Sequence, residues 1–200
     1  TKTLLGLNVV VFILASIFPA LMQTLALHYF QSPLFAMHQT VSHIFMHSGI
    51  AHLLFNMYAL AMFGSVVERQ LGTQKFCLLY FLSAIGAFFL HMGIIWWQVA
   101  DVPIDVLNII KTQGAEIIVN NQNYVDKYLG ELNIKYNGAL VGASGAIYGI
   151  MAALLATLFT LFNAKYINKV GAAKITMIEM LSGVLIISCI LFLVLLINFI

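Results

Sequence analysis

Two short stretches of this sequence hold residue types that could do chemistry. Ser144 lies in the run Gly142-Ala143-Ser144-Gly145, and a serine hydroxyl is a nucleophile once a neighbouring group activates it. His52 and Asn56 lie far upstream in an apolar run. An imidazole N–H and an amide are donors that can stabilise an oxyanion. The three residues together favour acyl transfer at a carbonyl.

The glycines around Ser144 indicate a packing face. Gly138, Gly142, Gly145 and Gly149 recur at a spacing that puts them near one side of a helix. Such a face lets a second backbone approach closely, as helices do in lipid. We expect this helix to hold Ser144 about a turn and a half from its start. An isolated Gly-x-Ser-Gly stretch is more often a packing face than a catalytic motif. The functional interpretation of Ser144 therefore depends on His52 and Asn56 upstream.

His52 and Asn56 are four residues apart, so they share one face of a predicted helix. Polar groups inside an apolar run need partners and are functional candidates. If both helices enter the bilayer from the same side, His52, Asn56 and Ser144 lie about 5–12 Å from the outer helix ends. Three polar side chains at a matching depth could line one water-filled pocket that opens outward.

A metal site is the alternative for the histidines. His43 and His47 are four residues apart, whereas His47 and His52 are five apart and point to different faces. No cysteine or acidic residue accompanies them, which disfavours a metal site. We predict no metal and no cofactor, with His43 and His47 hydrogen-bonded inside a structured loop.

The composition predicts a membrane protein. Of the 200 residues, 62% are hydrophobic and 8% are charged, and the mean hydropathy is +0.99, whereas a soluble domain carries about a quarter charged residues. The net charge is +2 and the basic residues form no cluster along the sequence, so nucleic acid is not a predicted partner. Cys77 and Cys189 lie in apolar runs and are predicted to be buried thiols.

Five apolar runs predict an all-α, polytopic membrane helix bundle within a single domain over residues 1–200. The runs are 4–27, 50–67, 76–99, 139–162 and 175–200. Asn8 and Pro19 interrupt the first run, which a packed membrane helix tolerates. Residues 28–48 carry four histidines and read as a structured loop near the interface. Residues 101–137 are polar and predict a small extramembrane insertion.

The basic residues of the short loops predict the orientation. Lys2, Arg69, Lys75 and the three lysines between 163 and 174 all fall on one side of the predicted bundle, and such residues favour the cytoplasm. We therefore expect a multi-pass protein with a cytoplasmic N-terminus. The histidine-rich loop and the 101–137 insertion then face outward.

The two chemistry-bearing stretches together resemble the rhomboid family of intramembrane serine proteases. The matching pieces are His47…His52…Asn56 and the stretch Gly142-Ala143-Ser144-Gly145, with a turn at 67–72 that is similar to the family's turn after its second helix. The resemblance covers roughly residues 39 to 150 and is specific because the motifs occur together. It implies a six-helix bundle, typical of a bacterial inner membrane. Such a bundle cleaves single-span membrane proteins in the lipid bilayer without metal or cofactor.

The resemblance also implies roles for individual residues. Ser144 is the nucleophile, and His52, Asn56 and the Ser144 backbone N–H form the oxyanion hole. His47 is a structural residue of the first loop, and Tyr148 packs against the catalytic imidazole. Two glycines support the site, and these are Gly142 and Gly145.

The sequence departs from the family at the general base, which is a histidine on the sixth helix. Here all six histidines lie at or before His91, so the chain is cut short, altered in its tail, or an inactive relative. We expect a rhomboid-like serine endopeptidase, and the alternative is an inactive rhomboid-like protein that binds transmembrane helices. A transporter is disfavoured because Glu179, near a helix end, is the only charged residue within a predicted span. The 200-residue chain itself is expected to bind a substrate helix and to cleave it near background.

Overall fold

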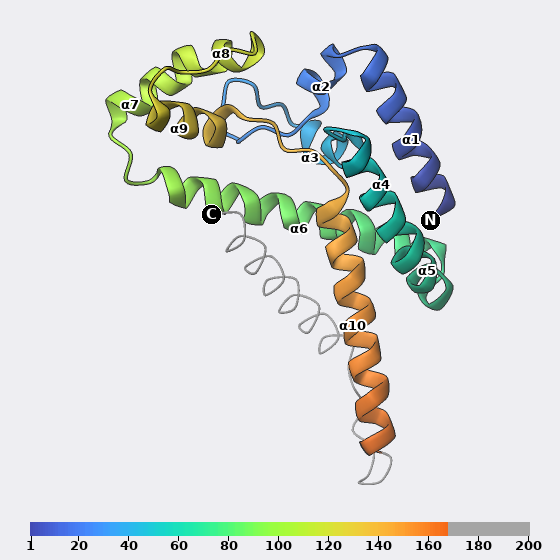
Figure 1. The fold of residues 1–200 in the computed structure, drawn as a ribbon. Helices are drawn as coiled ribbons and strands as arrows, with labels where there is room; N and C mark the ends of the chain where they lie inside the picture. The colour runs from blue at the N-terminus through green and yellow to red at the C-terminus, as the bar shows by residue number, and fades with distance from the viewer. Residues whose placement is uncertain (168–200) are drawn as a thin grey trace.

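The chain folds as helices and loops over the residues that the structure describes. This computed structural model describes residues 1–167, and the predicted span at 175–200 lies outside them. In chain order the elements are α1 (Lys2–Ile17), α2 (Ala20–Leu25), α3 (Gln39–Ser42), η1 (His43–Phe45), α4 (Ile50–Ala59), η2 (Leu60–Gly64), α5 (Ser65–Leu71), α6 (Thr73–Val99), α7 (Ile104–Ile109), η3 (Ile110–Gly114), α8 (Ala115–Val119), α9 (Lys127–Asn137) and α10 (Ser144–Ile167). Segment η1 is a 3-10 turn, and η2 and η3 are π-helical turns. The all-α class is confirmed for this range (Figure 1).

Two helices in the described range are long and apolar enough to cross a membrane. One runs without a break over Ile50–Leu71, through α4, η2 and α5, with a mean hydropathy of 1.7, and the other is α6, with a mean hydropathy of 2.0. Helix α1 and the segment Ser144–Ala156 of α10 are shorter apolar helices. Two of the five predicted spans therefore meet this criterion, and the count of five stays a prediction.

The first predicted span, 4–27, is wrong as a single helix. Helices α1 and α2 are separated by Phe18 and Pro19. Proline disfavours helical backbone at the residue before it, and Phe18 has φ −119° and ψ 84°. Asn8 stays inside α1, because its buried side chain donates to the Leu4 carbonyl at 2.7 Å. The proline ends this helix, whereas the asparagine does not disturb it.

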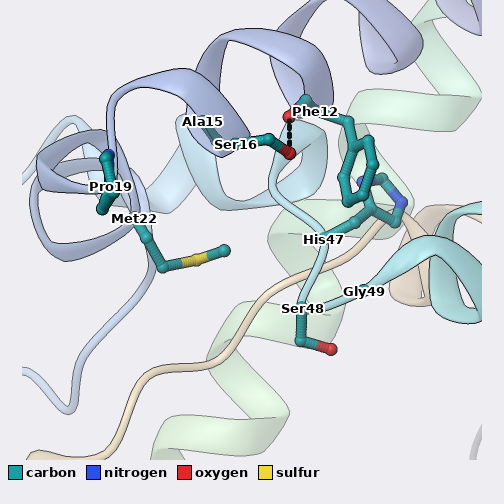
Figure 2. A pocket seen from close by; sticks show the side chains of 8 residues that line it. All are labelled: Phe12, Ala15, Ser16, Pro19, Met22, His47, Ser48 and Gly49. Carbon is teal, nitrogen blue, oxygen red and sulfur yellow. Dashed lines mark hydrogen bonds between the residues drawn. The ribbon is translucent and has the colours of Figure 1, made fainter. Parts of the chain in front are cut away.

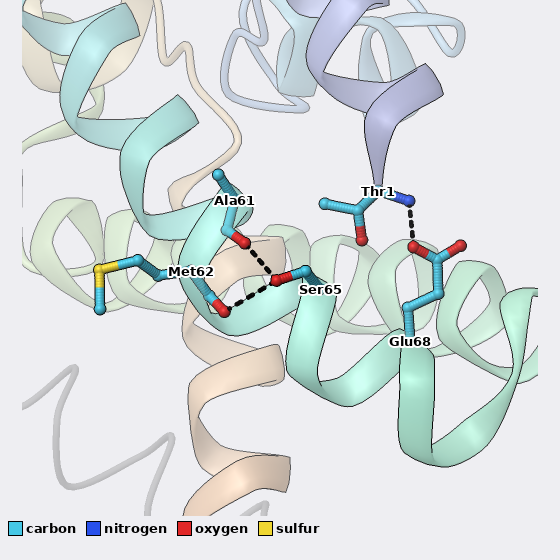
Figure 3. Close-up of polar contacts among 5 residues, drawn as sticks. All are labelled: Thr1, Ala61, Met62, Ser65 and Glu68. Atoms are coloured by element: carbon cyan, nitrogen blue, oxygen red, sulfur yellow. Dashed lines mark hydrogen bonds and ion pairs between the residues drawn. The ribbon is translucent and has the colours of Figure 1, made fainter.

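The π-turn η2 lies within the 50–71 helix, between α4 and α5, and contacts α1. The Ser65 hydroxyl donates to the carbonyls of Ala61 and Met62 at 2.6 and 3.3 Å (Figure 3). The Thr1 ammonium group donates to the Glu68 carboxylate at 2.6 Å. The start of α1 and the end of α5 therefore lie at one end of the bundle, in keeping with the charge pattern of the predicted loops.

Helix α6 is the element on which the described part of the molecule is built. Helix α10 crosses α6 (Figure 1) and packs against it more extensively than against any other element. An apolar core forms between these helices, η1 and the 50–71 helix. Its buried members are Leu4, Ile44, Leu60, Val67, Phe76, Tyr80, Ala84, Ala143, Ala146, Ile147 and Ile150.

The 101–137 insertion folds as two antiparallel helical segments, which we call the hairpin. The first segment runs through α7, η3 and α8, and the second is α9 (Figure 1). A second apolar core joins the hairpin to the C-terminal end of α6 and to the loop after α2. Its buried members are Leu27, Tyr29, Met92, Ile95, Val99, Ile110, Leu132 and Tyr136. The insertion is therefore packed on the bundle, and its position outside the membrane stays a prediction.

The fourth predicted span, 139–162, begins later than expected. Residues 138–143 are not helical, and α10 starts at Ser144. Within that segment Leu140 exchanges two backbone hydrogen bonds with Leu27, at 2.9 and 2.8 Å. The prediction that Ser144 lies a turn and a half inside the helix is therefore wrong, because this pairing holds the preceding residues extended.

The predicted face of four glycines is also wrong in part. Only Gly145 and Gly149 lie on α10, and both contact α6. A Cβ added to Gly145 would lie 2.6 Å from the Ala87 Cβ, and one added to Gly149 would overlap Ser83. Close approach of the two backbones therefore depends on two helical glycines, as small-residue packing in membranes requires.

We predict that Gly145→Leu lowers the free energy of unfolding by about 1–3 kcal/mol or more, because the new side chain must push α10 away from α6. The thermal unfolding midpoint in detergent micelles measures the change. Gly86→Leu is the matched control, since Gly86 lies on α6 and a Cβ there meets nothing within 4 Å. Equal midpoints for the two variants would contradict the proposed packing.

Candidate functional site

Gly142 is the residue that brings the two predicted stretches together. Its φ of +117° is a conformation that side chains rarely adopt, and its N–H donates to the His43 carbonyl at 3.0 Å. A Cβ at Gly142 would lie 2.8 Å from both Cε1 and Nε2 of His52, and 3.8 Å from Nδ2 of Asn56. The backbone two residues before Ser144 therefore lies directly on the His52 imidazole.

Ser144 stands at the N-terminus of α10, half-buried beside this glycine. The first backbone N–H groups of any helix have no partner inside the helix, and the helix dipole favours negative charge at that end. The Ser144 N–H is one of these groups. The later helix start thus gives the candidate site a property that the helix pattern did not predict, because unpaired backbone N–H groups lie at Ser144.

His52 and Asn56 lie on one face of α4, as their spacing predicts. Asn56 is buried and donates Nδ2–H to the His52 carbonyl at 2.9 Å. Ser48 Oγ lies 3.1 Å from Nδ1 of His52. When the Ser48 hydroxyl donates, the ring proton is on Nε2, which is the nitrogen next to Gly142, so that nitrogen can donate into the site.

Ser48 is a site residue that sequence reasoning missed. It lies just before α4, four residues before His52. That i, i+4 spacing across a helix start was the signal that could have identified it. The hydroxyl is exposed, so it is free to orient toward the imidazole.

His47 and His43 hold the loop that precedes α4. The rings of His47 and His52 meet edge to face with centroids 5.2 Å apart. His47 Nδ1 donates to the Phe45 carbonyl at 3.3 Å, and His43 Nδ1 donates to the Gln39 carbonyl at 2.7 Å. These bonds match the structural role predicted for both residues, and neither imidazole bonds Ser144 within residues 1–167.

Burial lowers the pKa of His47 from 6.5 to about 4, with a smaller lowering from the nearby His52 and an opposing effect of the Phe45 carbonyl. Burial also lowers the pKa of His43, against the opposing bond to Gln39. Both imidazoles in this loop are therefore neutral at pH 7. Neutral rings can donate and accept without placing a charge beside the site.

Tyr148 is the remaining predicted site residue, and His91 is the last histidine of the sequence. Neither side chain makes a hydrogen bond to Ser144 within the described residues. Tyr148 is half-buried on α10, one turn after Ser144, and among residues 1–167 its ring makes no aromatic contact with an imidazole. His91 lies on the α6 face of Ser83 and Ala87, at i+8 and i+4. That face contacts α10, so α6 turns His91 toward the site. Within the same described range no three His, Cys, Asp or Glu side chains gather as a possible metal site.

A cavity of about 280 Å³ opens between the first two helices and the loop that carries His47. Figure 2 shows it walled on one side by α1 and the turn after it, and on the other by residues 47–49. Its lining residues are Phe12, Ala15, Ser16, Pro19, Met22, His47, Ser48 and Gly49. The Ser16 hydroxyl donates to the Phe12 carbonyl at 2.8 Å, so its donor is used within α1. The other α1 residues that line the cavity, Phe12 and Ala15, are apolar. The cavity reaches the candidate site through Ser48.

Residues 34–96 match the family model of the Rhomboid domain. The matched range contains His47, His52 and Asn56 and ends before the segment that carries Ser144. No curated protein matches the sequence. The family match confirms the resemblance indicated by the motifs, and together with the two long apolar helices it indicates an integral membrane protein.

We predict that the thermal unfolding midpoint falls as the pH is lowered from about 6.5 to about 4. In this window the unfolded chain protonates His47 while the folded protein, with a pKa of about 4, keeps it neutral. The unfolded state then binds more protons, so acid favours it. His47→Asn keeps a donor for the Phe45 carbonyl and should flatten the dependence. His38→Asn, at an exposed histidine, should leave it unchanged, and a pH-independent midpoint in the parent protein would refute the prediction.

Proposed function

We propose that this chain, whose residues 34–96 match the family model of the Rhomboid domain, is a rhomboid-type intramembrane serine endopeptidase. Its substrates are the transmembrane segments of single-span membrane proteins. The catalytic group is Ser144, and the oxyanion donors are His52, Asn56 and the Ser144 backbone N–H. The observation that carries this proposal is the contact of Gly142 with the His52 ring, two residues before the serine.

The reaction that these residues support is acyl transfer. The Ser144 Oγ bonds to the carbonyl carbon of the scissile peptide while its proton passes to a base. The carbonyl oxygen becomes an oxyanion, which accepts hydrogen bonds from Nε2–H of His52 and from the amide of Asn56. Collapse of this intermediate breaks the C–N bond, the base protonates the leaving amine, and water then releases the acyl group from Ser144.

The geometry favours this assignment over a plain packing face. A packing serine needs no donors aimed at its surroundings, whereas here an imidazole and an amide meet the backbone of Gly142, two residues before Ser144. The extended segment before α10 also leaves the N-terminus of that helix free of a covering turn. Fixed donors around a point where charge develops are the usual main source of rate enhancement.

The general base for Ser144 is not among its hydrogen-bond partners in the described residues. The Ser144 hydroxyl makes no hydrogen bond within residues 1–167, and the 200 residues hold no histidine after His91. His52 serves as an oxyanion donor, and its use as the base would remove that donor. A histidine on a further helix, as in the family, would complete the dyad.

We further propose that the site opens toward the outer leaflet. In Figure 1 the hairpin, α3 and the start of α4 lie away from the start of α1 and from α5, the two elements that the Thr1–Glu68 ion pair joins. The basic loop residues favour a cytoplasmic location for that ion-paired end. Cleavage then occurs near the outer end of the substrate helix, and the N-terminus is cytoplasmic.

The second candidate is a catalytically inactive rhomboid-like protein that binds transmembrane helices. The observation behind it is that residues 92–200 of the given sequence hold no histidine. The two candidates share the fold and the substrate class. They differ in whether Ser144 can be activated when a base is supplied.

We predict that Asn56→Ala raises the barrier by about 1–3 kcal/mol, which is a loss of roughly 5- to 150-fold in kcat/KM, because one oxyanion donor is removed. Turnover of a single-span substrate in liposomes measures the change in the protein extended by a histidine-bearing sixth helix, and Ser144→Ala in the same protein gives the background rate. Asn108→Ala, at an exposed asparagine of the hairpin, is the control of the same residue type. An unchanged rate for the Asn56 variant would remove Asn56 from the site.

We predict that the 200-residue chain binds a substrate helix but cleaves it at or near background, because loss of the base costs a serine enzyme several orders of magnitude in rate. Appending a sixth helix that carries a histidine should restore cleavage and fluorophosphonate labelling, both abolished by Ser144→Ala. Binding without labelling in the extended protein would favour the inactive candidate. Robust Ser144-dependent cleavage by the unextended chain would make an upstream histidine the base.

A further inference from the structure

Asn137 ends α9 as a fully buried residue whose polar groups all have partners. Its carbonyl accepts from Nδ1 of His28 at 2.8 Å, and its Oδ1 accepts from the Ser32 hydroxyl at 2.6 Å. Its Nδ2 donates to the Ile110 carbonyl at 2.9 Å and to Oδ1 of Asn133 at 2.8 Å. One side chain therefore joins both segments of the hairpin to the loop after α2.

The π-turn η3 supplies the acceptors for this network. Ile110 and Gly114 are its first and last residues. The Ile110 carbonyl accepts from Asn137, and the Gly114 carbonyl accepts from Nδ2 of Asn133 at 3.1 Å. A Cβ on Gly114 would overlap Oδ1 of Asn133 and lie 2.8 Å from Nδ2 of Asn137. The close contact of the two segments requires this glycine.

A short extended segment leads from Asn137 to the site. Residues 138–143 are held at Leu140 by the two hydrogen bonds to Leu27, and at Gly142 by the bond to the His43 carbonyl. Gly142 lies on the His52 ring, and Ser144 follows two residues later. A displacement at Asn137 therefore moves the start of a segment whose other end sets the distance between Ser144 and His52.

We propose that the hairpin is a positioning element of the catalytic site, with Asn137 as the positioning residue that fixes Ser144 against His52. The inference rests on the proposed function only in taking Ser144 as the reacting residue. The family match ends at residue 96 and does not include the hairpin. The inserted hairpin thus acts on the reaction from a distance, through the backbone that it holds.

The test reads the position of residue 144 without requiring turnover. In the full chain with Cys77→Ala and Cys189→Ala, Ser144→Cys gives a single thiol, whose alkylation by iodoacetamide is followed against pH. Helix N-termini and nearby donors stabilise a thiolate and lower its pH midpoint. Asn137→Ala should raise that midpoint by about half to one pH unit and slow alkylation at pH 7 about three- to tenfold. Asn108→Ala should leave both unchanged.

A double-mutant cycle separates positioning from general loosening of the fold. His52→Ala should raise the midpoint in the same direction, and Asn137→Ala should add little in the His52→Ala background, because both act through one contact. Additive shifts, or no shift in a folded Asn137→Ala variant, would overturn the proposal. If Asn137→Ala does not fold, Ser32→Ala removes the hydrogen bond to Oδ1 of Asn137. The same alkylation midpoint should then rise in the Ser32→Ala variant, and an unchanged midpoint would overturn the proposal. If the protein that keeps Ser144 and is extended by a histidine-bearing sixth helix shows no fluorophosphonate labelling, while the alkylation result stands, the proposed function alone is rejected.

Discussion

The pairing of two irregular segments is the constraint on which the site depends. Backbone N–H and C=O groups away from water need partners, and in a bilayer irregular backbone occurs only where protein or a cavity satisfies it. Here the segment 138–143 bonds to the loop after α2, through Leu140 with Leu27, and to η1, through Gly142 with His43. These bonds also place a glycine of positive φ on an imidazole. Fold stability and site geometry therefore depend on the same few bonds.

The glycines around Ser144 have two different structural roles, although their spacing in the sequence forms a single periodic pattern. Gly145 and Gly149 let α10 approach α6, whereas Gly142 adopts a positive φ and leaves room for His52. Sequence spacing predicts the helix face correctly once the helix has begun. It does not show where the helix begins, because glycine and alanine carry no capping side chain. The start at Ser144 is set by a contact with Leu27, a residue more than a hundred positions away in the chain.

The parts of the site that sequence predicts are those that local geometry decides. His52 and Asn56 share a face because four residues make about one helical turn, and the same rule would have added Ser48. Pro19 is a helix-breaking residue that the length of the apolar run 4–27 outweighs in the sequence prediction, and the structure shows a helix end there. The Asn137 network was not predictable, because its partners at Ile110, Ser32 and His28 are distant in sequence. Two π-turns within apolar or mixed helices carry no sequence signal either.

Under the proposed function, the described residues supply the oxyanion-stabilising half of a serine-protease mechanism. The proposed donors at His52, Asn56 and the start of α10 would stabilise an oxyanion whether or not a base stands nearby. In serine proteases such donors, with substrate binding, keep about 10³–10⁴-fold catalysis over water after the triad is lost. Preorganisation of these donors depends on the packing of α10 on α6 and on the hairpin bonds. A site of this kind binds and polarises a carbonyl first, and it becomes a protease when a base reaches the Ser144 hydroxyl.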